Sequence, residues 1–396
     1  MKAAGGASRI IINTRANWPS AVASGAGTTC RMRKSPGWMM PCEERSMRWK
    51  GWDRVILDPE TREVCDTVRS TPLIDAIAPI IISASRSTDI PAFYGDWFME
   101  RLEQGYVTWT SPFNGRVLPV SFARARVFVF WSKNPRPFFP GIKALIGEGR
   151  QFIVLYTLND YDQEGLEPGI PSLSDRIRTF TELSSMIGRA RLSWRFDPLL
   201  LSDTLTVEDL LCRIGSIGDR IAPHAGRLVF SFIDIEKYPG VKRTLAASGI
   251  SGIREFSGEE IRQFAYGLSQ LNEEWDLEIQ ACGEGVDLSR YGIGRGECIS
   301  YDLLAKEFSQ DTALMDFLRP KGGSNLPEIR KRELKDPGQR GRCGCIVSKD
   351  IGRYSTCIHG CRYCYATSSL TLAEKNYRKY CDYKDQGIFH PGIIGE

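Results

Sequence analysis

The chain has 396 residues, of which 42% are hydrophobic and 25% charged, a composition typical of a globular protein with one large domain or two ordinary ones. The formal net charge of +4 is too small to argue for a nucleic-acid-binding protein by itself, although it does not exclude one. No apolar run approaches the length of about eighteen residues that spans a bilayer, so no membrane protein is expected.

Residues 1–75 show no sustained hydrophobic period, and we expect an irregular N-terminal extension there. The first 42 residues contain no Asp or Glu but several Arg and Lys, a composition that resembles an organelle transit peptide. The preferred interpretation is an upstream extension, with Met39, Met40 or Met47 nearer the true start, of a cytoplasmic protein.

Short apolar runs recur from residue 78 onward, each followed by a polar, helix-like stretch. The clear runs predict strands at 80–84, 127–131, 152–156, 191–195, 228–232 and 277–281, with weaker candidates at 106–109 and 252–256. Amphipathic stretches at 174–187 and 258–271 predict two of the intervening helices. Continuous runs that alternate with helices favour a parallel sheet buried on both faces. We therefore expect an α/β fold in which residues 76–340 form a (β/α) barrel-like domain, with an open doubly wound parallel sheet as the alternative.

Polar side chains gather where these predicted strands end, which is where barrels and open α/β sheets carry their functional groups. The candidates for a substrate pocket are Arg86, Asp89, Lys133, Asn134, Asn159, Asp160, Arg195, Asp197 and Lys237. Arg and Lys in such a pocket could clamp a carboxylate or a phosphate. For any single residue, capping of a turn or a helix start is the simpler explanation, above all for Ser87, Thr88 and Asp89.

Twelve cysteines are many for a chain with no secretory signal, and five of them lie between Cys343 and Cys364. In a reducing compartment, dense cysteines are more often metal ligands than a disulfide framework. Cys357, Cys361 and Cys364 have C-x3-C-x2-C spacing, with Tyr363 directly before the last cysteine. Three thiolates so spaced can bind three corners of a [4Fe–4S] cluster and leave the fourth iron open. Zinc and disulfides remain alternatives, although zinc prefers four ligands and C-x2-C pairs.

The cysteine cluster lies close to the end of the chain, and only 32 residues follow Cys364. Its local order still fits a βα unit, with a strand at 345–349, a loop that carries the cysteines, and a helix at 371–380. Residues 341–396 are therefore predicted to be a cluster-bearing βα unit that completes the barrel from the C-terminus. This arrangement would place the cluster at the same mouth as Arg86, Lys133 and Arg195.

The chain resembles an uncharacterised domain family whose C-terminal cysteine cluster is similar to that of radical S-adenosylmethionine (SAM) enzymes. The resemblance covers roughly residues 78–370 and rests on the segments 83–91 (SASRSTDIP), 131–135 (WSKNP), 194–198 (WRFDP) and 338–366. It implies a [4Fe–4S] cluster at the three loop cysteines, with SAM on the open iron and Tyr363 near the adenine. It further implies an electron donor and a 5′-deoxyadenosyl radical that acts on an unknown substrate. Ordinary radical SAM enzymes carry this loop after the first strand, so its position here departs from their pattern.

Four further cysteines, Cys282, Cys298, Cys343 and Cys345, are as many as a second [4Fe–4S] cluster or a structural zinc would need. Four small, buried apolar side chains are the alternative interpretation. The leading hypothesis for the whole chain is a radical SAM-like iron–sulfur enzyme. The alternative is a non-catalytic iron–sulfur or zinc-binding module for nucleic acid or a protein partner. Such a module would take its fourth ligand from Cys343 or Cys345.

Overall fold

The structure is a computed structural model that describes residues 53–57, 74–319 and 327–395. The transit-peptide and start-site interpretations fall on residues outside these ranges. β1 (Asp53–Leu57) is a regular strand inside the segment expected to be irregular, and it corrects that expectation. It pairs antiparallel with β2 (Ile74–Ala78), and this partner supplies the ladder hydrogen bonds that local periodicity does not reveal.

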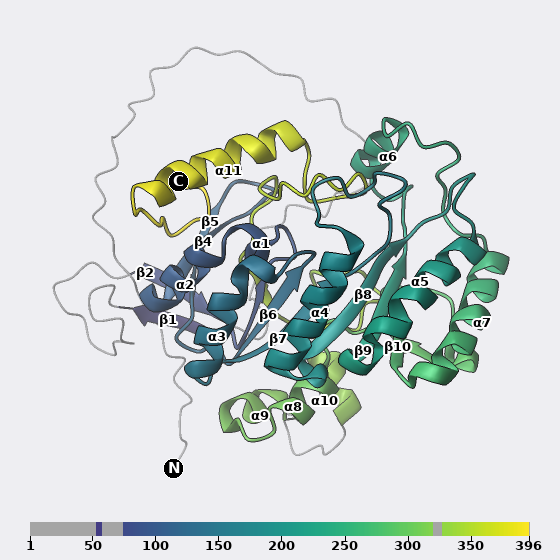
Figure 1. Cartoon of the computed structure of the whole chain (residues 1–396). Coiled ribbons are helices and arrows are strands. Elements are labelled where there is room, and N and C mark those ends of the chain that lie inside the picture. Colours follow the sequence, from purple (N-terminus) through teal and green to yellow (C-terminus); the bar gives the residue numbers. More distant parts are fainter. Residues whose placement is uncertain (1–52, 58–73, 320–326, 396) are drawn as a thin grey trace, which may run out of the picture.

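Eight parallel strands form the central sheet, in the order β11-β10-β9-β8-β7-β6-β3-β12. Figure 1 labels the consecutive strands β6 to β10 of this sheet. Their bounds are β3 (Ile81–Ala84), β6 (Val127–Ser132), β7 (Gln151–Thr157), β8 (Leu192–Leu199), β9 (Arg227–Phe232), β10 (Glu278–Ala281), β11 (Ile293–Arg295) and β12 (Lys349–Asp350). All six clear apolar runs are strands of this sheet, which confirms the predicted α/β class. Every residue of β9 is buried, so a continuous apolar run was needed to cover both of its faces.

The strand order runs in one direction from β3 to β11, as in a (β/α) barrel, and does not reverse as in a doubly wound sheet. β12, the last strand in the chain, pairs in parallel with β3, the first strand of this sheet. Within the described ranges no strand pairing joins the edge strands β11 and β12, so the sheet is barrel-like and a closed barrel is not established. The segment before β12 approaches the other edge, since the amides of Gly344 and Ile346 donate to the carbonyls of Gly296 and Ile299.

Three expected strands differ from the observed ones. The strand expected at 345–349 is wrong in extent, because only Lys349 belongs to β12. The candidate at 252–256 is not a strand, since Arg254 forms just an isolated bridge to Leu201. The candidate at 106–109 is β4 (Tyr106–Thr110), but it pairs with β5 (Val117–Ser121) in a second sheet of order β1-β2-β5-β4. Short segments take their strand pairing from distant partners, so a local pattern does not predict it.

The helices are α1 (Ile90–Phe93), α2 (Gly95–Gln104), α3 (Phe139–Gly147), α4 (Leu173–Ile187), α5 (Val207–Ile221), α6 (Pro239–Ala246), α7 (Gly258–Trp275), α8 (Tyr301–Glu307), α9 (Thr312–Leu318), α10 (Pro327–Leu334) and α11 (Leu370–Asp385). The predicted helices at 174–187, 258–271 and 371–380 are confirmed as α4, α7 and α11. α7 begins with a capping box formed by Ser257 and Glu260. No helix in the described part of the chain is long and apolar enough to cross a membrane.

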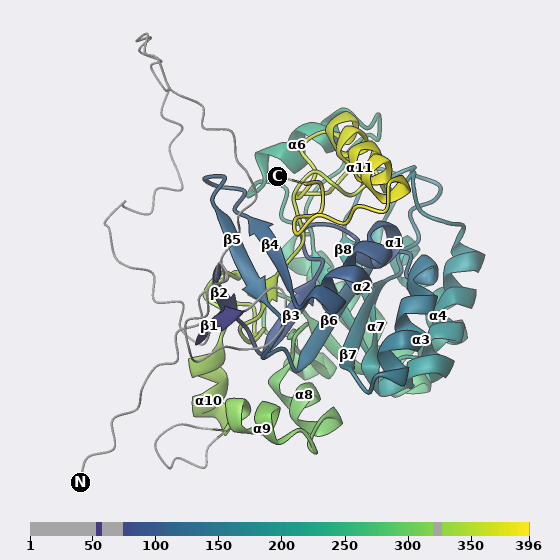
Figure 2. The same ribbon diagram turned by 90° about the vertical axis from the view of Figure 1, so that its left-hand side faces the viewer.

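The helices divide into a layer and two end groups. α3, α4, α5 and α7 cover one face of the sheet, α6 and α11 lie at one end of it, and α8, α9 and α10 lie at the other (Figures 1 and 2). Alternate strand residues serve two cores, so Phe128 and Phe130 pack in the larger core while Val127 and Val129 pack in a second. The second core also contains α8, α9 and all four cysteines of the set Cys282, Cys298, Cys343 and Cys345.

Candidate functional site

The loop that carries the cysteine motif, residues 353–367, is held against the carboxyl ends of the parallel strands. The amide of Gly169, in the connection after β7, donates to the carbonyl of His359 at 2.8 Å. The amide of Arg362 donates to the carbonyl of Leu166 at 2.9 Å. On the side of β3, the Tyr94 hydroxyl donates to the carbonyl of Thr356 at 2.7 Å. We call residues 353–367 the cysteine loop.

His359 fixes the cysteine loop to the segment after β3. Its ring is buried, with Nε2 2.8 Å from the Asp89 carboxylate and Nδ1 3.2 Å from the carbonyl of Gly169. Asp89 also accepts from the amide of Ala92, so the expectation that it caps a helix is confirmed at the start of α1. The same carboxylate accepts from the amide of Lys133 at 2.8 Å. Both ring nitrogens of His359 are therefore engaged and are not placed to bind a metal.

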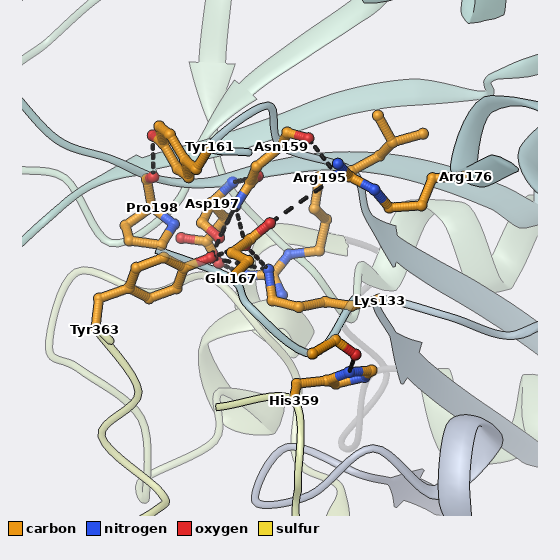
Figure 3. Close-up of polar contacts among 12 residues, drawn as sticks. Lys133, Asn159, Tyr161, Glu167, Arg176, Arg195, Asp197, Pro198, His359 and Tyr363 are labelled. Atoms are coloured by element: carbon orange, nitrogen blue, oxygen red, sulfur yellow. Dashed lines mark hydrogen bonds and ion pairs between the residues drawn. The ribbon is translucent and has the colours of Figure 1, made fainter. Parts of the chain in front are cut away.

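Glu167 is the centre of a buried polar network that reaches the cysteine loop (Figure 3). Its Oε1 accepts from Lys133 Nζ at 2.6 Å and from Asn159 Nδ2 at 3.0 Å. The Tyr363 hydroxyl donates to the same Glu167 oxygen. The hydroxyl oxygen of Tyr363 in turn accepts from Lys133 Nζ and Asn159 Nδ2, at 3.0 Å each. Arg176 lies 3.9 Å from the other carboxylate oxygen. Tyr363 thus connects the cysteine loop to Lys133, which follows β6, and to Asn159 and Glu167, which follow β7.

Opposite charges hold this network in its ionised form. Burial alone would raise the pKa of Glu167, but Lys133, Tyr363 and Arg176 together lower it below its ordinary value. Burial would lower the pKa of Lys133, whereas Glu167 and the nearby Cys361 raise it. Burial raises the pKa of the Cys361 thiol, and the Lys133 ammonium opposes that rise. The Lys133 charge therefore acts on both the Glu167 carboxylate and the Cys361 sulfur.

Of the nine pocket candidates, the network contains Asp89, Lys133, Asn159, Arg195 and Asp197. The amide of Asp197 donates to Asn159 Oδ1 at 2.9 Å, and the Asp197 carboxylate pairs with Arg195. Arg86 lies close by, because Arg86 and Arg195 stand 5.4 and 4.7 Å from the ring centroid of Trp131. The Arg86 guanidinium itself is bound to Asp336 and Ser348.

The remaining candidates, Asn134, Asp160 and Lys237, do not join the network. The amide of Asn134 donates to the Ser132 hydroxyl, which is the turn-capping geometry of the simpler interpretation. The carbonyl of Asp160 accepts from Arg213 on α5, away from its neighbour Asn159. Lys237 is exposed and pairs with Asp234. A position just after a strand therefore does not by itself place a polar residue in the network.

Two members of the network, Glu167 and Arg176, were missed in the sequence. Arg176 is 1% exposed and donates to the carbonyl of Asn159 and, at 2.7 Å, to Asp162. A signal for Arg176 was present, since it lies at helical spacing from Phe180 on the apolar face of the predicted helix. Glu167 lies in an irregular connection, where no periodic pattern distinguishes a buried carboxylate from an exposed one.

The three loop thiols are free, and none is in a disulfide. Across residues 53–57, 74–319 and 327–395, no group of three or more Cys, His, Asp or Glu side chains is placed to hold a single metal ion. Ligands of a four-iron cluster bind different iron atoms and need not converge on one point. Two cavities of about 420 and about 370 Å³ are lined by residues at the amino ends of strands, such as Gln151 of β7 and Glu278 of β10. Neither cavity is lined by the cysteine loop.

Comparison with known proteins gives a family and little else. The family model described as "Domain of unknown function (DUF1848)" matches residues 81–366. The comparison with curated proteins found no match. Among solved structures, the chain is similar to a crystal structure described as a "putative alpha-L-fucosidase from Bacteroides thetaiotaomicron", with 12% identity over 65% of this chain and 82% of that one. The TM-score is 0.21, so this likeness carries no argument about the present chain.

Proposed function

The chain belongs to the DUF1848 family, and we propose that it is a radical SAM-like enzyme whose cysteine loop binds a [4Fe–4S] cluster through Cys357, Cys361 and Cys364. The observation that carries the proposal is the position of this loop. It is anchored at the carboxyl ends of the parallel strands and reaches Lys133 and Glu167 through Tyr363. Folds with parallel sheets generally have their active sites at this end of the strands.

The residues of the loop fit the ligand set of such a cluster. All three thiols are free and partly exposed, and Gly360 has φ +69°, a left-handed conformation that lets the chain turn sharply before Cys361. The best-placed alternatives for a fourth protein ligand are occupied elsewhere. Cys343 and Cys345 contact Cys282 and Cys298, and His359 is bound to Asp89. These contacts support an open fourth iron, which is the position that SAM needs.

When bound, the cluster with SAM would supply a 5′-deoxyadenosyl radical that removes hydrogen from a substrate. The chain's own residues would position the reactants. Tyr363 fixes the loop to the strand ends, and the resemblance places it near the adenine. Lys133 and Arg195 would attract a carboxylate of SAM or of the substrate. Since Glu167 and Asp197 already pair with these cations, a bound anion would have to share them.

The test is anaerobic purification with iron and sulfide analysis, followed by incubation with SAM and a chemical reductant. We expect about four iron and four sulfide ions per chain and the formation of 5′-deoxyadenosine. Cys361→Ala should lose the iron, whereas Cys381→Ala, a matched change outside the loop, should keep it. Purified protein that holds zinc and no iron would overturn the proposal. The proposal also requires an electron donor and a reducing, cytoplasmic environment for the cluster.

A non-catalytic iron–sulfur or zinc module that binds nucleic acid or a protein partner is the second candidate. It is favoured by the internal pairing of Lys133 and Arg195, and by the two cavities lying at the opposite end of the strands. Iron and sulfide that are present without any 5′-deoxyadenosine formation would support this candidate over the enzyme.

A further inference from the structure

Four cysteines outside the cysteine loop come together in the second core. Cys282 follows β10, Cys298 follows β11, and Cys343 and Cys345 precede β12. Their exposed fractions are 7%, 2%, 3% and 2%, so all four are buried. Three separate segments thus deliver four thiols to one place, which packing of small apolar side chains alone does not require.

The four thiols form a closed ring of contacts. Cys298 Sγ lies 3.7 Å from Cys282 Sγ. Cys343 contacts both Cys282 and Cys345, and Cys345 contacts Cys298. Each sulfur therefore has two sulfur neighbours, and none of the four is in a disulfide. A pair of disulfides would instead give each sulfur one bonded partner at about 2.05 Å.

The distance between the sulfurs of Cys282 and Cys298 favours one kind of metal site. Zinc–sulfur bonds of about 2.3 Å place the sulfurs of a tetrahedral four-cysteine site about 3.8 Å apart, close to the observed 3.7 Å. The ligands of a [4Fe–4S] cluster bind separate iron atoms and lie farther apart than this. In the described part of the chain no group of three or more Cys, His, Asp or Glu side chains is placed to hold a metal ion as it stands, so the four thiols would have to rotate to converge. Rotation about the Cα–Cβ bond of cysteine allows this movement.

The backbone around the thiols also suits bound thiolates. The amide of Ile299 donates to Cys345 Sγ at 3.4 Å, and the amide of Cys345 donates to Cys343 Sγ at 3.5 Å. Such hydrogen bonds hold metal-bound sulfurs in place. A Cβ at Gly296 would come within 2.4 Å of Cys282 Cα, so glycine is needed there to bring the Cys298 segment against Cys282.

Three arginines lie close to the four thiols. A zinc ion with four thiolates has a net charge of −2, which is costly to bury without cations nearby. Arg227 is 3% exposed, and its guanidinium donates to the carbonyl of Cys298 at 2.9 Å. It also interacts electrostatically with the thiols of Cys298 and Cys345. Arg195 interacts electrostatically with the thiols of Cys282 and Cys298, and Arg340 with that of Cys282. These arginines would compensate the charge of the filled site.

We propose that Cys282, Cys298, Cys343 and Cys345 bind one structural Zn²⁺ ion that ties the segment before β12 to the ends of β10 and β11. The ion would span the gap between the two edges of the parallel sheet. It would thereby hold the last βα unit, and the cysteine loop that follows β12, against the rest of the fold. The site is separate from the cysteine loop, so its failure and the failure of the proposed function can be distinguished.

The experiment measures zinc, iron and sulfide in the full chain carrying Cys357→Ala, Cys361→Ala and Cys364→Ala, so that the loop holds no iron. We expect about one zinc per chain, with no iron or sulfide. Adding Cys345→Ser or Cys282→Ser should reduce zinc at least tenfold, whereas adding Cys212→Ser should leave it unchanged. Tetrahedral thiolate absorption after Co²⁺ replacement should appear in the first protein and be absent from the Cys345→Ser protein.

Several results would overturn the proposal. Iron with sulfide in the triple variant would indicate a second cluster, and iron without sulfide would indicate a mononuclear iron site. A metal-free chain whose four thiols resist alkylation until a reductant is added would indicate disulfides. If the serine variants fail to fold, the metal content of the unaltered chain still decides, because it must contain zinc in addition to any iron.

Discussion

Replacing Glu167 with Gln tests whether the buried network holds the strand ends and the cysteine loop together. The Glu167 side chain is 1% exposed and its Oε1 is 2.6 Å from Lys133 Nζ. Glu167→Gln keeps the shape but removes the charge, so the Lys133 ammonium, whose side chain is 16% exposed, loses its counter-ion. Breaking a buried ion pair in this way costs about 3–5 kcal/mol. With a urea m value of about 3 kcal/mol/M, the unfolding midpoint should fall by roughly 1–1.7 M.

The assay is urea unfolding followed by circular dichroism at neutral pH. Glu182→Gln is the matched control, because Glu182 pairs with Arg136 at 2.7 Å but both side chains are exposed. That surface pair should contribute about 0–1 kcal/mol. Because the folded-state pKa of Glu167 is lowered, the ionised carboxylate contributes its full share to folding stability above the ordinary glutamate pKa. This contribution to stability disappears as the pH falls through the lowered pKa. The difference between wild type and Glu167→Gln should therefore shrink in acid.

The outcome that refutes this reasoning is a Glu167→Gln protein as stable as Glu182→Gln. A double-mutant cycle sharpens the test, since Lys133→Met should cost less in the Glu167→Gln background than in the wild type. Equal costs in the two backgrounds would mean that the Lys133–Glu167 contact contributes nothing to stability.

Two further predictions concern the cysteine loop and β12. His359→Ala leaves the buried Asp89 carboxylate without its ring partner, so we expect a loss of about 1–3 kcal/mol and faster proteolysis within residues 353–367; unchanged proteolysis would contradict the anchoring role. Burial lowers the pKa of Lys349 to about 7, whereas an unfolded lysine titrates at about 10.4. Between these values the unfolded chain binds the extra proton, so wild-type stability should rise with pH and Lys349→Met should abolish that rise in urea midpoints. If the urea midpoint of the Lys349→Met protein rises with pH as steeply as that of the wild type, the role assigned to Lys349 is refuted.

Local apolar patterning correctly predicted six of the eight strands of the central sheet, because those strands are largely buried. β9 is an example, with every residue from Arg227 to Phe232 buried. β11 and β12 were missed or misplaced because they are three and two residues long and depend on neighbouring strands for pairing. β4 was found, but its place in an antiparallel sheet was not, since its hairpin partner β5 was not recognised as a strand in the sequence.

The cysteine motif is the feature that the sequence by itself determined, because the spacing of Cys357, Cys361 and Cys364 lies within one short loop and needs no distant partner. Tertiary structure decided which polar residues share a site. Asn159 and Asp160 are adjacent in the chain, yet the Asn159 side chain enters the Glu167 network, whereas Asp160 contacts Arg213 on α5 through its carbonyl. Partners that are distant in the sequence decide this difference, and the local pattern does not show them. Likewise, Cys282 and Cys345 are far apart in sequence, and parallel pairing of β12 beside β3 brings their segments together.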